Sequence, residues 1–265
     1  MTERSGARPR TGERPRTGDA FGELLRAAHA ARTGRGPRPV LGSRDPVPVV
    51  EVVERDDGFI SAAPADRYLA EPSAWPGADR AALDLCRGRV LDVGAGGGRI
   101  ALALQERGLD VTALDVSPGA IDVCRERGVH RTVVGTVGAH DGEYDTFVLW
   151  CNNLGLLGGP AVAPGFLAAL ARLAAPGARV VAQGTNPYGG SGDPVHLAYQ
   201  DRNRRRGRMP GHLTVRIRYR DLATPWFDYL LCSPDELREL LRGTRWRLAD
   251  VDDTEPSRYT AVLRI

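Results

Sequence analysis

Residues 90–99 read Val-Leu-Asp-Val-Gly-Ala-Gly-Gly-Gly-Arg, a short apolar run that passes into a glycine-rich segment. The apolar run predicts a buried strand at 90–93, and the helical pattern that begins at Arg99 stops at Gly108. Glycines between a strand and a helix let the backbone come close to a ligand, with amide N–H groups turned toward it. The stretch therefore predicts a binding loop at 94–98, of a kind that dinucleotide, mononucleotide and sulfonium cofactors all use.

Strand and helix patterns alternate beyond this loop. Strands are predicted at 111–115, 133–134, 146–150 and 179–183, with helices after Ser117 and around 166–173. Such alternation favours a doubly wound α/β fold with a mostly parallel sheet. A capping box at 233–236 predicts one more helix, and the strands at 246–251 and 259–265 predict a C-terminal antiparallel hairpin.

The segments around this core differ in character. Residues 1–18 repeat Arg-Pro and Thr-Gly without apolar anchors, so we expect a disordered tail. Residues 19–84 hold an amphipathic helix, a hairpin signal and helical pieces broken by prolines, and are expected to cover the cofactor and substrate. The core is placed at 85–265. Within it, residues 185–232 do not fit a single crossover and are expected to be an insertion.

Two carboxylates sharpen the reading of the glycine loop. Asp92 lies two residues before the first glycine, and Asp115 ends the second strand, where a carboxylate can accept hydrogen bonds from both ribose hydroxyls. Arg99 stands where the dinucleotide fingerprint requires Gly or Ala, which weakens a nicotinamide interpretation.

With these features the chain resembles the class I S-adenosylmethionine-dependent methyltransferases. The resemblance is carried by residues 91–99, 114–117 and 144–148 and by the turn at Pro176-Gly177. It covers residues 85–184 well and residues 233–265 moderately. It implies a Rossmann-like sheet of seven strands, mostly parallel, with S-adenosyl-L-methionine bound across the carboxyl ends of the strands.

The resemblance also implies roles for individual residues. Asp92 would orient the ammonium group of the cofactor, Asp115 would hold the ribose, and Val116 would pack on adenine. The family often has an acidic residue after the third strand, where this chain has Gly135-Thr136-Val137, so that contact would pass to backbone or to Thr136. The full expected cofactor set is Tyr68, Asp92, Gly94, Ala95, Gly96, Gly98, Asp115, Val116, Thr136, Trp150 and Cys151.

Methyl transfer from a sulfonium is an in-line displacement, so alignment and exclusion of water can supply most of the acceleration. No fixed catalytic motif is therefore expected. His196 and Tyr199, three residues apart, are candidates for a helix face turned toward the substrate, with a packed or solvated helix as the alternative. Asn152, followed by Asn153, is a candidate for orienting the acceptor, with a simple turn as the alternative.

The net charge of +3 is unevenly distributed. Residues 1–40 carry nine arginines and four acids, which leaves the rest of the chain near −2. The chain has no lysine, which excludes Schiff-base and P-loop chemistry. Eight arginines between 202 and 220 admit three interpretations: solvated faces, a guanidinium-lined pocket for an anionic substrate, or a track for an RNA backbone.

The four cysteines are widely spaced and form no CxxC pair, so neither a metal site nor a disulfide framework is expected, and a cytoplasmic location is predicted. No apolar run is long enough to span a membrane, and no signal sequence is apparent.

The sequence thus predicts a methyltransferase that uses S-adenosyl-L-methionine and acts on a small molecule in specialised metabolism, with an anionic acceptor as one option. Neither a nucleic-acid nor a membrane partner is expected. Two alternatives stay open: an RNA methyltransferase that uses the basic segments, and a binding or cyclising protein that retains the cofactor without consuming it.

Overall fold

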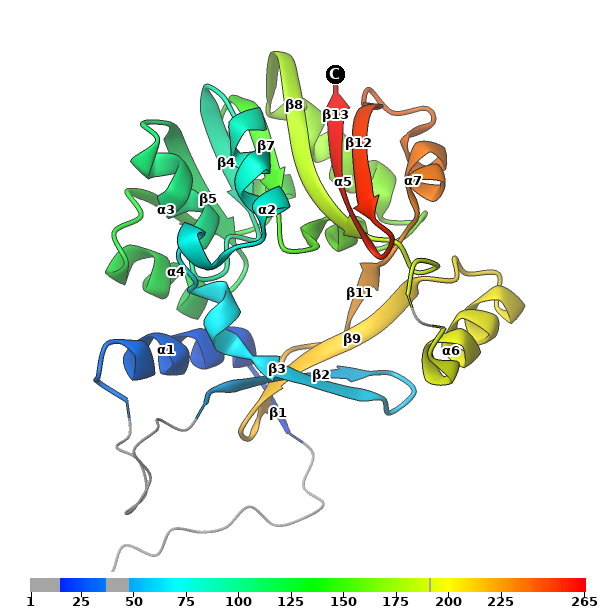
Figure 1. Ribbon diagram of the computed structural model, residues 1–265, viewed down its shortest axis with the longest axis horizontal. Helices are drawn as coiled ribbons and strands as arrows, with labels where there is room; N and C mark the ends of the chain where they lie inside the picture. The colour runs from blue at the N-terminus through cyan, green and yellow to red at the C-terminus, as the bar shows by residue number, and fades with distance from the viewer. Residues whose placement is uncertain (1–14, 37–47, 191) are drawn as a thin grey trace, which may run out of the picture.

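The computed structural model describes residues 15–36, 48–190 and 192–265, which form two sheets (Figure 1). The larger sheet has seven strands in the order β12-β13-β8-β7-β4-β5-β6. Its strands are β4 (Arg89–Val93), β5 (Asp110–Asp115), β6 (Arg131–Val134), β7 (Tyr144–Leu149), β8 (Ala174–Thr185), β12 (Arg247–Glu255) and β13 (Arg258–Arg264). Strands β4 to β8 pair in parallel, whereas β13 is antiparallel to both of its neighbours. The predicted mostly parallel sheet with a C-terminal antiparallel hairpin is confirmed.

Packed layers bury both faces of this sheet. Along β4, Val90 packs in a cluster with Leu104, and its neighbour Leu91 packs on the opposite face in a cluster with Leu167. Because both faces are covered, the strand reads as a continuous apolar run instead of an alternating one. The helices of this unit are α2 (Gly77–Ala82), α3 (Arg99–Glu106), α4 (Pro118–Glu126), α5 (Ala163–Arg172) and α7 (Pro234–Leu241). Short 3-10 helices are η1 (Ala65–Tyr68), η2 (Pro72–Ala74), η3 (Leu83–Leu85), η4 (Val137–Ala139) and η5 (Asn153–Leu157).

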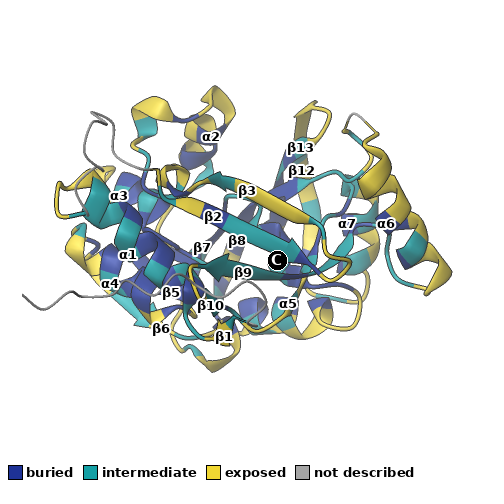
Figure 2. Ribbon diagram, turned by 90° about the horizontal axis from the view of Figure 1, so that it is seen from below, coloured by how far each residue is buried: buried dark blue, intermediate teal, exposed yellow. Residues whose placement is uncertain are grey.

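The second sheet, here called the cover sheet, is built from two distant parts of the chain. Its strands are β1 (Arg16–Thr17), β2 (Val50–Arg55), β3 (Ile60–Pro64), β9 (His212–Tyr219), β10 (Leu222–Ala223) and β11 (Phe227–Leu230). Strand β2 pairs with β9, with Val53 opposite Ile217. The segments predicted as an N-terminal cover and a separate insertion therefore form one sheet. It lies below the larger sheet in Figure 1, and Figure 2 views it from that side.

Two helices belong to the cover: α1 (Ala20–Arg32) and α6 (Pro194–Arg205). Helix α1 is the amphipathic helix expected in this region; it has Asp19 as its N-cap and contacts α4 of the core. Within the described ranges, no helix combines the length and apolar character needed to cross a membrane.

The predicted disordered tail needs a correction at its end. Residues 1–14 lie outside the described residues, but Arg16–Thr17 form strand β1, parallel to β10. Two backbone hydrogen bonds hold this strand, from Arg16 N to Asp221 O at 2.8 Å and from Gly18 N to Ala223 O at 2.9 Å. The cover sheet supplies these partners from more than 200 residues away, so composition of the tail alone could not reveal them.

Helices α1 and α4 cross where Gly22 meets Gly119. A Cβ atom on Gly119 would lie 2.6 Å from Gly22 Cα and 2.8 Å from Gly22 C, and these are backbone atoms that cannot move aside locally. We expect Gly119→Ala to destabilise the protein by about 1–3 kcal/mol through overpacking, measured by chemical denaturation. Gly165→Ala is the matched control, because Gly165 also lies in the first turn of a helix and a Cβ there meets nothing within 4 Å. Equal stability of the two variants would contradict this account of the crossing.

Candidate cofactor and acceptor site

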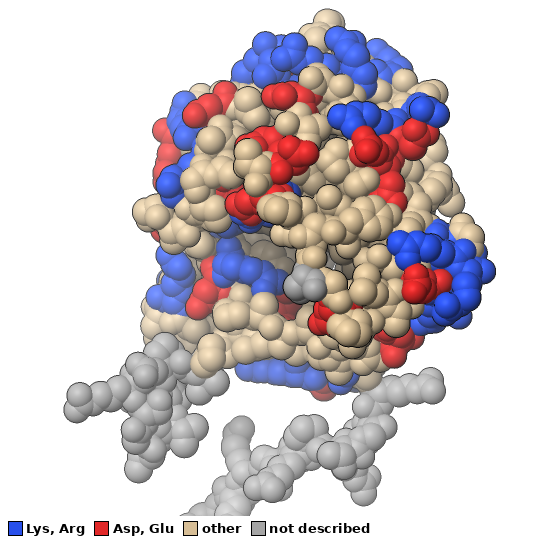
Figure 3. All heavy atoms as spheres, turned by 45° about the vertical axis from the view of Figure 1, so that its right-hand side comes forward, with Lys and Arg blue, Asp and Glu red and all other residues tan. Residues whose placement is uncertain are grey.

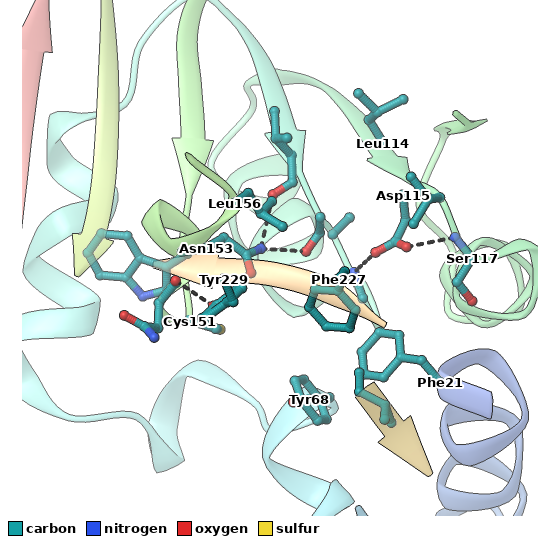
Figure 4. Close-up of a pocket in the computed structure, with 18 of the residues that line it drawn as sticks. Phe21, Tyr68, Leu114, Asp115, Ser117, Cys151, Asn153, Leu156, Phe227 and Tyr229 are labelled. Atoms are coloured by element: carbon teal, nitrogen blue, oxygen red, sulfur yellow. Dashed lines mark hydrogen bonds between the residues drawn. The ribbon is translucent and has the colours of Figure 1, made fainter. Parts of the chain in front are cut away.

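A cavity of about 1360 Å³ lies between the cover sheet and the carboxyl ends of β4, β5 and β7. Its volume exceeds the ~300–1,000 Å³ of a typical single-ligand pocket, so it has room for two ligands side by side. Figure 3 shows the molecule hollowed between its upper and lower parts, and Figure 4 shows the residues of the two units facing each other across the cavity. The position matches the rule that open α/β sheets bind ligands at the carboxyl ends of their strands.

The first three residues of the predicted glycine loop, Gly94, Ala95 and Gly96, line this cavity. Gly94, Gly96 and Gly98 all have positive φ values, of 71°, 54° and 74°. An ideal Cβ on Gly94 would lie 2.6 Å from Nδ2 of Asn153, whose amide donates to the carbonyl oxygens of Val93 and Gly94 at 3.0 and 2.8 Å. Glycine is therefore required at position 94 by both conformation and space.

The loop amides differ from the sequence-based expectation. The N–H groups of Gly94 and Ala95 donate to Leu114 O at 2.8 and 3.1 Å, and Gly98 N–H donates to Ala95 O at 2.9 Å. They are engaged within the protein because the loop folds back on the end of β5. The expectation that these three amides point at a ligand is wrong. What the loop offers a ligand is a backbone surface without side chains.

Asp115 lies at the end of β5, with 6% of its surface exposed. Its Oδ2 accepts the Gly96 N–H at 2.9 Å, and its Oδ1 accepts the Ser117 N–H at 2.9 Å. An ionised carboxylate has about four acceptor positions, so two remain for a ligand. Burial raises the pKa of Asp115, and the backbone N–H groups oppose that rise. Val116 follows it, 66% exposed and lining the cavity, as an apolar surface beside the carboxylate.

Asp92 lies at the end of β4 and is 2% exposed. Among the described residues, its Oδ2 has no hydrogen-bond partner. Burial, followed by the nearby charge of Asp115, raises the pKa of Asp92 to about 7. A buried carboxylate oxygen without a partner is costly, and a cationic ligand group beside it would remove that cost.

The end of β7 closes the cavity on another side through Trp150, Cys151 and Asn152. Cys151 and Asn152 have left-handed backbone conformations, with φ of 54° and 68°, which non-glycine residues adopt at an energetic cost. The Tyr229 hydroxyl of the cover sheet donates to Asn152 O at 2.5 Å and holds this turn (Figure 4). Trp150 Nε1 and Asn152 Oδ1 are buried without hydrogen-bond partners among the described residues.

Tyr68 approaches the glycine loop from the cover side. An ideal Cβ on Gly96 would lie 3.9 Å from the Tyr68 ring, which contacts Phe21 edge to face with ring centroids 5.2 Å apart (Figure 4). The Tyr68 hydroxyl donates to Glu51 Oε1 at 2.9 Å. Thr136 lines the cavity in the loop after β6, as expected. The full predicted cofactor set, Tyr68, Asp92, Gly94, Ala95, Gly96, Gly98, Asp115, Val116, Thr136, Trp150 and Cys151, is thus brought to this cavity except Gly98, which lies at the far end of the loop.

The two catalytic candidates on α6 lie elsewhere. Neither His196 nor Tyr199 lines the cavity. A guanidinium nitrogen of Arg55 lies 3.1 Å from His196 Nδ1, the Arg55 guanidinium lies over the Tyr199 ring at 4.0 Å, and the Tyr199 hydroxyl donates to Asp56 Oδ1 at 2.7 Å. They do share a helix face, but this face packs on the β2–β3 hairpin. Their predicted catalytic role is corrected to attachment of α6.

The arginines of the insertion lie outside this cavity. Arg216 and Arg218 pair with Glu54, and Arg202 pairs with Asp56. None of the eight lines the cavity. Acidic groups interrupt the basic ones on the face shown in Figure 3. Arg218 and Arg220 instead line a separate, smaller pocket with Val50, Val52 and Tyr219, so a guanidinium-lined pocket, if it binds a ligand, is not part of this cavity.

Several cavity residues were missed by the sequence analysis. Asp79 on α2 is 3% exposed, accepts a hydrogen bond from Gln183 Nε2 at 3.1 Å and pairs with Arg99 at 3.5 Å. Glu51 on β2 is 2% exposed and pairs with Arg67. The sequence offers one indication of Glu51, because it is the single acidic residue within the apolar run 49–53. It offers no such indication of Asp79, because the segment around Asp79 has no clear periodicity.

Comparison with known proteins bears on this site. Residues 90–177 match the methyltransferase domain family. A malonyl-[acyl-carrier protein] O-methyltransferase from Serratia marcescens is 32% identical over 42% of this chain and 40% of its own length. A ubiquinone biosynthesis O-methyltransferase from Xanthomonas oryzae pv. oryzae is 43% identical over 20% of this chain and 22% of its own length. The match therefore spans less than half of either curated relative.

One solved structure is similar over nearly the whole chain. A SAM-dependent methyltransferase from Bacteroides fragilis, in complex with S-adenosyl-L-homocysteine, has a TM-score of 0.74 at 22% identity, covering 92% of this chain and 94% of its own. The CcbJ methyltransferase from Streptomyces caelestis has a TM-score of 0.53 at 21% identity, covering 76% and 95%. These likenesses concern the fold. The family match shows that residues 90–177, which hold the strand, the glycine loop and Asp115, are a methyltransferase domain, and the solved structures share the fold around it.

Proposed function

We propose that this protein transfers the methyl group of S-adenosylmethionine to a small-molecule acceptor held between the two sheets. The observation that carries the proposal is the cavity itself: its size allows a cofactor and an acceptor together, and the expected cofactor residues line one side of it. A covered cavity suits small molecules of the kind modified in specialised metabolism better than a long RNA strand. The relatives from Serratia and Xanthomonas are both O-methyltransferases, which supports transfer to a small or carrier-bound acceptor.

The residues present fit the cofactor. Asp115 has two free acceptor positions for the two ribose hydroxyls, and the exposed Val116 offers a surface for adenine. Asp92 lacks a partner for its Oδ2, which suits the ammonium group of the methionine part. The side-chain-free glycine loop leaves room for the chain between them. We assign Trp150 and Cys151 to the wall beside the methyl group.

Bound S-adenosylmethionine supplies an electrophilic methyl group on a positively charged sulfur. The protein contributes orientation and a water-poor site, which can account for most of the acceleration of such a displacement. In our proposal the cover sheet excludes water, and the strained turn at Cys151-Asn152, fixed by Tyr229, shapes the space next to the reacting carbon.

A titration with S-adenosyl-L-homocysteine tests this proposal. We expect saturable binding by calorimetry, and a ligand concentration of about a hundred times Kd should stabilise the fold by ~2.7 kcal/mol in chemical denaturation. NAD serves as the control ligand and should not bind, because Arg99 occupies a position that the dinucleotide fingerprint reserves for a small residue. If S-adenosyl-L-homocysteine does not bind, or if NAD binds more tightly than S-adenosyl-L-homocysteine, the proposed function is rejected.

A further inference from the structure

The cavity continues beyond the cofactor residues into a part that we call the acceptor compartment, lined by Glu51, Val53, Asn152, Phe227 and Tyr229. Resting on the function proposed above, we infer that this compartment binds an amine, and that Glu51 is the residue that receives its amino group.

Glu51 is a buried, ionisable side chain among apolar neighbours of the cover sheet. Glu51 and Val53 lie on the cavity side of β2, while Val50 and Val52 line a different pocket. The residues that the neighbouring β9 turns to the cavity are apolar: Leu213, Val215 and Ile217. An ionisable group that is 2% exposed on an otherwise apolar wall carries a desolvation cost. Such a cost is typical of a residue with a specific ligand contact.

The contacts of Glu51 place it beside the glycine loop. It accepts the hydroxyl of Tyr68, whose ring lies over Gly96 of that loop. Tyr229, whose hydroxyl is bonded to Asn152 at the end of β7, lines the same cavity. Burial raises the pKa of Tyr229, and the negative charge of Glu51 adds to that rise. Glu51 therefore faces a cavity that the glycine loop and the end of β7 also line.

The acceptor capacity of Glu51 is not exhausted within the protein. Its carboxylate receives hydrogen bonds from Tyr68 and Arg67, and about four positions are available on an ionised carboxylate. Arg67 approaches with a side chain that is 45% exposed, so solvent weakens its compensation of the buried charge. The remaining positions suit an N–H donor of the ligand.

The charge of the whole cavity favours a cation over an anion. Its lining includes six carboxylates and three guanidinium groups, the carboxylates being Asp19, Glu51, Asp79, Asp92, Asp115 and Asp228 and the guanidinium groups Arg67, Arg99 and Arg258. Asp228 pairs with Arg208 outside the lining, so two carboxylates are in excess. The cofactor offsets only part of this excess, because its carboxylate cancels one of its two positive charges. A second positive group is accommodated, whereas an anionic acceptor would be repelled.

Transfer to an amine also explains why a carboxylate is useful here. The nitrogen lone pair forms the N–C bond while the S–C bond breaks and its electron pair stays on sulfur. An ammonium acceptor must give up one proton for this step, and we assign that proton to the Glu51 carboxylate.

Binding of 2-phenylethylamine to the protein saturated with S-adenosyl-L-homocysteine tests the inference. Its neutral and anionic counterparts are 2-phenylethanol and 3-phenylpropionate, and Kd is measured by titration for all three. We expect the amine to bind at least about tenfold more tightly than either counterpart, and Glu51→Gln to remove that preference. No preference in the parent protein, or an unchanged preference in the variant, overturns the inference.

Two further variants separate ligand binding from a structural role. Glu54→Gln removes a carboxylate from the same strand, but Glu54 pairs with Arg216 outside the cavity, so the amine preference should stay. Arg67→Met removes the ion pair of Glu51 and should also keep the preference. Equal loss in Arg67→Met and Glu51→Gln would mean that Glu51 only anchors Arg67. If the protein binds S-adenosyl-L-homocysteine but shows no preference for the amine, this inference alone is rejected. If it does not bind S-adenosyl-L-homocysteine, the proposed function is rejected.

Discussion

Asp115→Ala is expected to weaken binding of S-adenosyl-L-homocysteine at least a hundredfold. In our proposal the two free acceptor positions of this carboxylate take both ribose hydroxyls. Each lost hydrogen bond that leaves a buried donor unpaired costs about 1–3 kcal/mol, and ~2.8 kcal/mol corresponds to a hundredfold change in Kd. The substitution also removes the acceptor for the Gly96 and Ser117 N–H groups, so the loop beneath the ligand loses its support. Calorimetric titration at pH 8 measures the change.

Asp110→Ala is the matched control. Asp110 lies at the other end of β5, is exposed and pairs only with Arg131 among the described residues, so its removal should leave the affinity unchanged. Asp115→Asn adds a second comparison, because an amide oxygen can still accept one hydrogen bond and part of the affinity should return. If Asp115→Ala binds the ligand as tightly as the parent protein, the ribose site lies elsewhere.

The parts that the sequence revealed are those determined by local pattern. Ser117 and Ser233 cap helices through the hydrogen bonds expected of them, because an N-cap depends only on residues within one turn. Asp115 could be recognised for a similar reason. The last residue of a parallel strand lies at the edge of the sheet where ligands bind. The glycine loop and Asp115 also belong to one βαβ unit, so their spacing can be recognised locally.

The cover sheet shows where such patterns stop. The pairing of Val53 with Ile217 joins segments more than 160 residues apart, and no pattern in either segment predicts which strand it pairs with. His196 and Tyr199 were correctly predicted to share a helix face, but which neighbour that face meets depends on this long-range pairing. The prediction for the loop amides was wrong because partners close in space satisfy them. Leu114 O on β5 accepts the N–H groups of Gly94 and Ala95, and Ala95 O accepts that of Gly98.

Cofactor affinity should also depend on pH through Asp92. The pKa of this carboxyl is raised to about 7, first by burial and then by Asp115, while Arg99 and the Ala101 N–H lower it. An ammonium group binds the ionised form, so affinity for S-adenosyl-L-homocysteine should rise about tenfold from pH 6 to pH 8. Below pH 7, binding should release a proton, which calorimetry in two buffers of different ionisation enthalpy detects.

Asp92→Asn isolates this effect from the other groups that titrate in the same range. The variant should bind about ten- to a hundredfold more weakly at pH 8, since hydrogen bonds to charged groups contribute about 1.5–3 kcal/mol, and its affinity should not rise with pH.

The free energy of unfolding of the ligand-free parent protein should change with pH in the direction opposite to the affinity. Between the ordinary pKa of an aspartate and 7, the folded state keeps a proton that the unfolded state has released, so this group makes the fold less stable as pH rises. A parent protein that binds equally well at pH 6 and pH 8 would place the ammonium group away from Asp92. In that case no contact with this ligand would offset the cost of burying the Asp92 carboxylate.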